Sequence, residues 1–220
     1  MSLAAGRAGS RSGADRVSAA AISGLVLAAG GSERLGRPKQ LLPYGPVPLL
    51  AHVLETARGC DFHQLLCVLG GGAAEVRKQI DFDGVTVVEN RRFGDGCSAS
   101  IATALGAVDP QSEGVILLLG DQPGVSAATV AALVEHGAQA PLAVCRYEDG
   151  RGHPLMFGRS MFGELADLHG DKGVWKLLER HAEDLVQVPV AGRIPLDVDT
   201  WQDYESVLGA AGSPAGIPAI

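Results

Sequence analysis

The sequence predicts an α/β protein, with a mostly parallel central sheet that carries helices on both faces. Short apolar runs of strand length alternate with helical patterns along the 220 residues. Aromatic residues make up only 5% of the chain, so the core must consist mainly of Val, Leu, Ile and Ala. Such a composition suits a parallel sheet that is buried on both faces.

The predicted strands are continuous apolar runs that end at glycines or acidic residues. The first run ends in Gly30 and Gly31, and the most hydrophobic run passes directly into Gly120 and Asp121. A further apolar segment leads into Asp199 and is expected to end another strand. The predicted strands are residues 22–29, 65–69, 85–88, 115–119, 141–145, 154–157, 185–190 and 195–198.

Helices are predicted where apolar residues recur at helical spacing. Ser126 is the expected N-cap of one helix, and Thr200 is the expected N-cap of the last, with Asp203 completing a capping-box pattern. The segment Glu-Asp-Gly-Arg-Gly at residues 148–152 is typical of a turn between two strands. The predicted helices are residues 48–58, 73–80, 98–108, 127–136, 161–168, 173–181 and 201–208.

The chain is expected to form a single domain over residues 21–208, with no internal repeat and no interior linker. Residues 1–20 and 209–220 are low in complexity, and we expect a disordered N-terminal extension and a flexible tail. An early start codon is an alternative explanation of residues 1–20. A transit peptide is another, because the Arg/Ser/Ala bias of this segment resembles that of organellar transit peptides.

Charge and cysteine content exclude several classes of protein. The net charge of −7 argues against nucleic-acid binding, which requires a basic surface. No apolar run approaches the roughly 18 residues of a membrane span, and no secretory signal is recognisable. The four cysteines lack the spacing of a zinc site and are typical of a reducing compartment. We therefore expect a cytoplasmic protein with no membrane partner.

A glycine-rich basic loop follows the first predicted strand, at residues 27–39. It lacks the Gly-x-Gly-x-x-Gly motif of dinucleotide-binding proteins. Gly31 and Gly36 have the spacing of a P-loop, but Pro38 breaks the helix that a P-loop must enter. Glycine N–H groups and an excess of basic side chains nevertheless suit a polyphosphate ligand. Taken alone, the same residues could also form a surface turn.

Residues 27–43 read Leu-Ala-Ala-Gly-Gly-Ser-Glu-Arg-Leu-Gly-Arg-Pro-Lys-Gln-Leu-Leu-Pro, which resembles the signature of the MobA-like nucleotidyltransferases. The molybdenum cofactor cytidylyltransferase branch is the most similar, and the resemblance covers about residues 22–208. It implies a Rossmann-like, three-layer nucleotide-diphospho-sugar transferase fold. It also implies that the loop wraps a nucleoside triphosphate, with Arg34 and Lys39 as catalytic residues that neutralise phosphate charge. The loop residues then expected at the nucleotide are Leu27, Ala28, Ala29, Gly30, Gly31, Ser32 and Gly36.

Two aspartates are expected to hold Mg²⁺. Asp121 follows the most hydrophobic strand, and Mg²⁺ usually takes only one or two protein carboxylates together with water and phosphate oxygens. The resemblance places the metal on Asp121 and Asp199, with Asp197 less favoured. Each aspartate could instead serve only as a turn or cap residue. The neighbouring Gln122 is expected at the nucleotide.

The segment 90–100 forms another polar cluster after a predicted strand. The resemblance implies that Gly96, Ser98 and Ser100 lie beside the base and ribose of the nucleotide. Without the resemblance, the same residues indicate only a polar loop and a serine N-cap. We assign no chemistry to the thiol of Cys97.

The acceptor pocket is expected at two further motifs. His153 belongs to a Gly-His-Pro sequence, and Asp171 and Lys172 belong to Gly-Asp-Lys-Gly, both of which resemble acceptor-binding motifs of the family. His153 could also be a satisfied polar residue of the core. Val174 and Trp175 stand where the family has Ala-Arg, so a bidentate phosphate ligand is missing and the identity of the acceptor is in doubt.

The implied reaction is attack of an acceptor phosphate on the α-phosphorus of a nucleoside triphosphate, with release of pyrophosphate. CTP and molybdopterin are the expected substrates. GTP with the same acceptor and sugar-1-phosphate transfer are the alternatives. A nucleotide-binding maturation factor without turnover, acting on a client molybdoenzyme, is an alternative of a different class.

Overall fold

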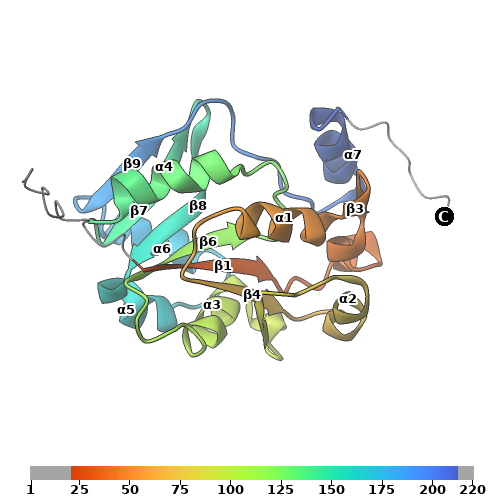
Figure 1. The fold of residues 1–220 in the computed structure, drawn as a ribbon, viewed down its shortest axis with the longest axis horizontal. Coiled ribbons are helices and arrows are strands. Elements are labelled where there is room, and N and C mark those ends of the chain that lie inside the picture. Colours follow the sequence, from red (N-terminus) through yellow and green to blue (C-terminus); the bar gives the residue numbers. More distant parts are fainter. Residues whose placement is uncertain (1–20, 213–220) are drawn as a thin grey trace, which may run out of the picture.

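The computed structural model describes residues 21–212, which form a three-layer α/β structure (Figure 1). The central sheet has the strand order β5-β4-β1-β6-β8-β7-β9, in which β8 alone runs antiparallel to its neighbours within the described chain. The predicted α/β class and mostly parallel sheet are confirmed. The predicted disordered extension at 1–20 lies outside the described residues, as do residues 213–220 of the predicted tail.

The strands are short and largely buried, as the continuous apolar runs predict. Parallel β1, β4 and β6 form the middle of the sheet. The bounds are β1 Ile22–Ala28, β4 Gln64–Leu69, β5 Thr86–Glu89, β6 Gly114–Leu119, β7 Leu142–Tyr147, β8 Gly150–Gly158 and β9 Leu185–Pro189. A small separate hairpin, β2 Pro43–Tyr44 with β3 Val47–Pro48, was not predicted from the sequence.

The helices cover both faces of the sheet and separate its apolar side chains into two cores. Helices α1, α2 and α4 share one core with one face of the sheet, and α3, α5 and α6 share the other. Helix α7 packs in a smaller cluster with Leu42 and Leu49. The bounds are α1 Leu49–Arg58, α2 Ala73–Gln79, α3 Cys97–Leu105, α4 Ala127–Gly137, α5 Phe162–Ala166, α6 Gly173–Arg180 and α7 Trp201–Ala210.

Two predicted helix caps are confirmed. The Ser126 side chain accepts a hydrogen bond from the backbone N–H of Thr129. Thr200 and Asp203 form a reciprocal capping box at the start of α7. The serine N-cap predicted for the helix at residues 98–108 is wrong, because α3 begins at Cys97 and its N-cap is Gly96.

Two further expectations are corrected by the structure. Residues 150–152, predicted as part of a turn, are the first residues of β8, because β7 and β8 form an antiparallel hairpin that turns at residues 148–149. Residues 195–198, predicted as a strand, pair with no strand. There, Val198 is buried in the cluster beneath α7, so its apolar character reflects burial in a loop.

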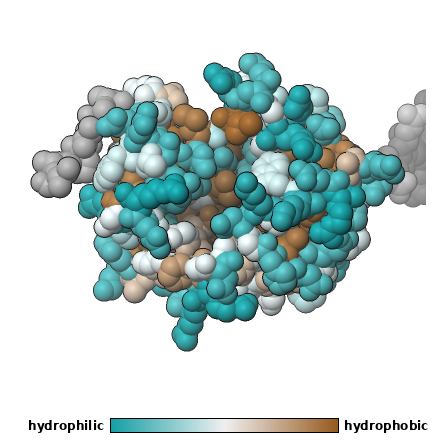
Figure 2. Space-filling model, turned by 180° about the vertical axis from the view of Figure 1, so that it is seen from behind, coloured by the Kyte–Doolittle hydropathy of each residue, from teal (hydrophilic) through white to brown (hydrophobic). Residues whose placement is uncertain are grey.

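Apolar side chains are packed mainly inside the layers. Figure 2 shows one face of the molecule covered chiefly by hydrophilic side chains, with hydrophobic atoms visible around a hollow near its middle. Among residues 21–212, no helix combines the length and apolar character that crossing a membrane requires.

Candidate active site

The carboxyl ends of β1, β4 and β6 meet at one edge of the sheet, where parallel strands of α/β proteins present their ligand sites. Glycine lets these ends approach closely. A Cβ atom on Gly120 would lie 2.8 Å from the Cβ of Ala28, and one on Gly70 would lie 2.6 Å from the carbonyl oxygen of Ala29. A cavity of about 280 Å³ opens at this edge. It is lined by Leu27, Ala28, Ala29, Gly30, Lys39, Gln40, Phe93, Gly96, Cys97, Ser100, Leu119, Gly120, Asp121, Asp171 and Asp199.

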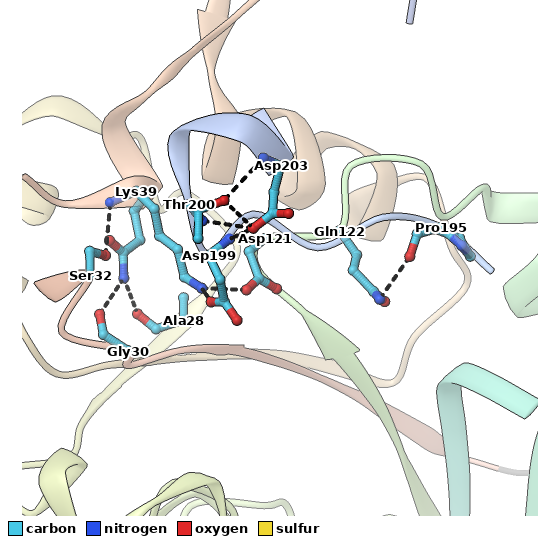
Figure 3. Close-up of polar contacts among 11 residues, drawn as sticks. Ala28, Gly30, Ser32, Lys39, Asp121, Gln122, Pro195, Asp199, Thr200 and Asp203 are labelled. Atoms are coloured by element: carbon cyan, nitrogen blue, oxygen red, sulfur yellow. Dashed lines mark hydrogen bonds and ion pairs between the residues drawn. The ribbon is translucent and has the colours of Figure 1, made fainter. Parts of the chain in front are cut away.

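The glycine-rich loop folds back over the end of β1. Its turn is closed by Ser32, which has a left-handed backbone (φ 54°) and whose hydroxyl accepts a hydrogen bond of 3.0 Å from the backbone N–H of Lys39 (Figure 3). The buried Gln40 amide donates to the carbonyl oxygens of Ala28 at 2.7 Å and Gly30 at 3.3 Å. These bonds fix both ends of the loop and direct the Lys39 side chain to the strand edge.

Lys39 joins the two predicted metal ligands. Its ammonium nitrogen lies 2.6 Å from Oδ2 of Asp121 and 2.7 Å from Oδ1 of Asp199, which come from the end of β6 and from the segment before α7 (Figure 3). The Lys39 side chain is only 13% exposed. Burial lowers the pKa of Lys39, but the charges and hydrogen bonds of the two carboxylates outweigh this effect, and its pKa is raised. The lysine is therefore protonated at neutral pH.

The electrostatics of Asp121 differ from those of Asp199. Burial raises the pKa of Asp121, Lys39 lowers it and the nearby charges of Asp197 and Asp199 raise it again, with a net rise. The side chain of Asp121 is 16% exposed, whereas that of Asp199 is 53% exposed. Of the two carboxylates that contact Lys39, that of Asp121 is thus largely buried and that of Asp199 faces solvent.

The donor set at this point fits a hard divalent cation. Both carboxylates converge on one position, that of the Lys39 ammonium, so they can also converge on a cation. Within residues 21–212, no group of three or more His, Cys, Asp or Glu side chains forms a closed metal site. Two carboxylates, completed by water and phosphate oxygens, are the arrangement that Mg²⁺ commonly uses.

The segment at the start of α3 packs against the segment before α6. Gly96 has a φ of 95°, and a Cβ atom there would lie 2.7 Å from Oδ1 of Asp171. The same oxygen accepts a hydrogen bond of 3.0 Å from the backbone N–H of Cys97. Ser98 is buried and its hydroxyl donates to the carbonyl oxygen of Gly170. The predicted nucleotide loop and the predicted acceptor loop therefore form one structural unit.

Residues of this segment differ in their access to the cavity. Gly96 and Ser100 line it, but Ser98 does not. The Ser100 hydroxyl accepts a hydrogen bond of 3.0 Å from the side-chain amide of the buried Asn90. Burial raises the pKa of Cys97 to about 11, and Asp171 and Asp121 add to this rise, so the thiol stays protonated at neutral pH. This agrees with assigning it no chemistry.

Several predicted site residues lie away from the cavity wall. Arg34 is exposed on the loop. Hydrogen bonds from Thr200 lower the pKa of Asp203, and the nearby charge of Arg34 lowers it further. Arg34 therefore lies on the side of α7. Gln122 is buried and donates to the carbonyl oxygen of Pro195 at 3.0 Å (Figure 3). It therefore anchors the segment that carries Asp199. The predicted residues that do not line the cavity are Gly31, Ser32, Arg34, Gly36, Ser98, Gln122, His153 and Lys172.

His153 is a half-buried residue of β8 that contacts α6. Its ring packs edge-on against Trp175 with 5.6 Å between ring centroids, and its carbonyl oxygen accepts a hydrogen bond from Tyr147. Burial lowers the pKa of His153 to about 4. The imidazole is therefore neutral at pH 7 and offers no positive charge to an acceptor phosphate.

Several residues of the cavity wall were not predicted from the sequence. Gln40 directly follows Lys39, and its buried amide could have been suspected from that position alone. Phe93 stands in a polar loop without any periodic pattern, so only the folded structure reveals its place. Leu119 is the last residue of β6, and Gly120 links it to Asp121; both residues line the cavity.

Solved structures of similar proteins share the fold and most of the chain length. Rv0371c from Mycobacterium tuberculosis H37Rv is 48% identical, with a TM-score of 0.82, and the alignment covers 87% of this chain and 100% of that chain. A structure of Rv0371c in complex with manganese is 47% identical, with a TM-score of 0.77, over 86% of this chain and 98% of that chain. Structures of nucleotidyltransferases have the same nucleotide-diphospho-sugar transferase fold.

Two curated relatives match shorter parts of the chain. Nicotine blue oxidoreductase from Paenarthrobacter nicotinovorans is 29% identical over 161 residues, which are 69% of this chain and 78% of that protein. The bifunctional protein GlmU from Cupriavidus necator is 39% identical over 138 residues, which are 61% of this chain. The chain spans only 29% of the length of GlmU.

The family model of the MobA-like NTP transferase domain matches residues 24–185, which is well over half of the chain. The matched range contains the glycine-rich loop, the cavity wall from β1 to α6 and Asp121. The chain belongs to the MobA-like NTP transferase family.

Proposed function

We propose that this protein is a nucleotidyltransferase that transfers CMP from CTP to the phosphate of molybdopterin and releases pyrophosphate, with Mg²⁺ as its cofactor. The observation that carries the proposal is the contact of Lys39 with both Asp121 and Asp199 beside the glycine-rich loop. A phosphate-binding loop, a buried cation and two convergent carboxylates together suit a metal-bound triphosphate. A site for binding phosphate alone has no need of the acidic pair.

In the proposed site, Asp121 and Asp199 hold the divalent cation, which neutralises charge on the triphosphate when bound. The loop residues 28–32 bind the phosphates through their backbone. The Lys39 ammonium holds the point between the two carboxylates that the cation would take, so a bound cation would free the ammonium to contact the phosphate oxygens and to stabilise charge at the α-phosphorus. Arg34, exposed on the loop, supplies a second cation.

No general base is required by this chemistry. A phosphate monoester is already a dianion near pH 7 and can attack the α-phosphorus without losing a proton. Catalysis then rests on positioning and charge neutralisation. The described cavity wall agrees with this account, since none of the residues that line it is a histidine. Asp171 lines the cavity and is the proposed acceptor contact, with Lys172 beside it.

The finer parts of the proposal rest on the sequence. The Leu-Ala-Ala-Gly opening and the Gly-Asp-Gln-Pro motif favour CTP, and GTP-dependent transfer and sugar-1-phosphate transfer are the alternatives. We also propose a single catalytic domain at residues 21–208, a cytoplasmic location and delivery to a client molybdoenzyme.

A thermal-shift panel with ATP, CTP, GTP and UTP, each with Mg²⁺, tests the nucleotide site. A ligand at about 100 times its Kd stabilises a protein by about 2.7 kcal/mol, which raises the Tm of a domain of this size by roughly 5–10 °C. We expect CTP to give the largest rise, which increases with CTP concentration and shrinks when EDTA removes the cation. The absence of a rise with all four nucleotides would refute the proposed site, and a larger rise with GTP would change the assigned base.

A further inference from the structure

The cavity is lined by the ends of β1 and β6, and its wall on the β4 side is Phe93, which packs against Gly70 and Gly71. Asp121 follows β6, and Gly70 and Gly71 follow β4, with β1 lying between these two strands. Two strand spacings correspond to about 10 Å. The charged groups stand over the β6 side, so a triphosphate held there leaves the β4 side of the cavity to the rest of the nucleotide.

Phe93 forms the wall of the cavity on the β4 side. It is the only aromatic side chain among the described residues that line the cavity. Its side chain is large, apolar and 40% exposed, and only Leu196 and Trp201 share this property within residues 21–212. An apolar ring that remains this exposed at a cavity mouth gains free energy when a ligand covers it.

Three glycines provide the seat for this ring. A Cβ atom on Gly70 would lie 2.7 Å from the Cβ of Phe93, and one on Gly71 would lie 3.4 Å from its Cε2. A Cβ atom on Gly31, in the phosphate loop, would lie 3.6 Å from the same Cε2. The ring therefore packs against the backbones of two loops. It has a defined position between the phosphate loop and the end of β4.

We propose that Phe93 is the residue on which the nucleobase stacks. This inference rests on the proposed function, because it takes the charged side of the cavity as the phosphate site. Every base has a π face, so stacking on phenylalanine contributes affinity for nucleotides without selecting one base. Base selection then falls to polar groups, for which Ser100 and the backbone near Gly96 line the same cavity.

Isothermal titration of Phe93→Leu with CTP and with inorganic triphosphate, each with Mg²⁺, tests this proposal. Leucine keeps an apolar side chain of similar bulk and removes the ring. We expect nucleotide binding to weaken roughly 5- to 100-fold while triphosphate binding stays unchanged. Phe93→Trp should retain nucleotide binding, and its added indole fluorescence should change when CTP binds. Leu196→Ala, which alters an exposed apolar side chain outside the cavity, is the matched control and should bind both ligands like the wild type.

The outcomes separate this inference from the proposed function. Equal binding of CTP by Phe93→Leu and the wild type would overturn the stacking role alone. Equal loss of CTP and triphosphate binding would also overturn it, because Phe93 would then only support the loop. Unchanged CTP affinity with a raised KM for the acceptor would assign the ring to the acceptor instead. A wild-type protein that binds neither CTP nor triphosphate would overturn the proposed function together with this inference.

Discussion

Lys39→Ala is expected to lower the rate of nucleotidyl transfer by about 10²–10³-fold while the protein remains folded, since this is the usual effect of removing one preorganised charge from a transition state. Lys39 is the residue through which the phosphate loop contacts both acidic groups of the site. The measurement is kcat with saturating CTP, Mg²⁺ and acceptor, accompanied by circular dichroism to verify the fold.

A second readout distinguishes the electrostatic role of Lys39 from a structural one. Without the ammonium, Asp121 and Asp199 repel each other, so the variant should have a lower Tm in EDTA than the wild type. Added Mn²⁺ or Mg²⁺ should recover more of the Tm in the variant than in the wild type. Lys78→Ala, which removes an exposed lysine on α2, is the control and should match the wild type in rate and Tm. Transfer at the wild-type rate by Lys39→Ala would contradict the assignment.

Asp121→Asn is expected to weaken Mn²⁺ binding in the presence of nucleotide by at least about tenfold and to lower kcat/KM by roughly 10²-fold. Asparagine preserves the shape of the side chain but removes the charge of the less exposed carboxylate. Mn²⁺ binding is measured by electron paramagnetic resonance, and kcat/KM by pyrophosphate release at several cation concentrations.

Asp197→Asn is the matched control for this change. Asp197 is close enough to raise the pKa of Asp121, but it is exposed and does not line the cavity. Its substitution should leave Mn²⁺ binding within about twofold of the wild type, as is usual for surface changes. If Asp197→Asn lost the cation and Asp121→Asn kept it, the metal would have to be reassigned to Asp197 and Asp199.

The strand-end residues could be predicted because buried parallel strands carry a strong local signal. Each continuous apolar run becomes a strand of the sheet, except the segment 195–198. The rule that ligands bind beyond the carboxyl ends of strands then brings Lys39 and Asp121 to one edge. Asp199 lies near the same edge, as predicted, but for a different reason. It follows a loop that packs beneath α7, and not the strand that was predicted at residues 195–198.

The remaining parts of the site depend on tertiary contacts that have no local pattern. Ser98 and Gln122 belong to polar motifs, yet both are buried and make hydrogen bonds that hold neighbouring loops. A sequence does not distinguish a polar side chain that binds a ligand from one that satisfies a buried carbonyl. Phe93 reaches the cavity only because Gly70 and Gly71 leave room for its ring. The pairing of Lys39 with both predicted metal ligands was likewise visible only after folding.

Pyrophosphate release from CTP with Mg²⁺ and reduced molybdopterin is the decisive measurement of the proposed activity. We expect that release requires all three components, stops when EDTA is added and yields one pyrophosphate for each molybdopterin converted. Release with GTP instead of CTP would keep the transferase and change the base. The absence of release with each of the four nucleoside triphosphates, from a protein that still binds nucleotide, would contradict the proposal that this protein transfers a nucleotide to molybdopterin.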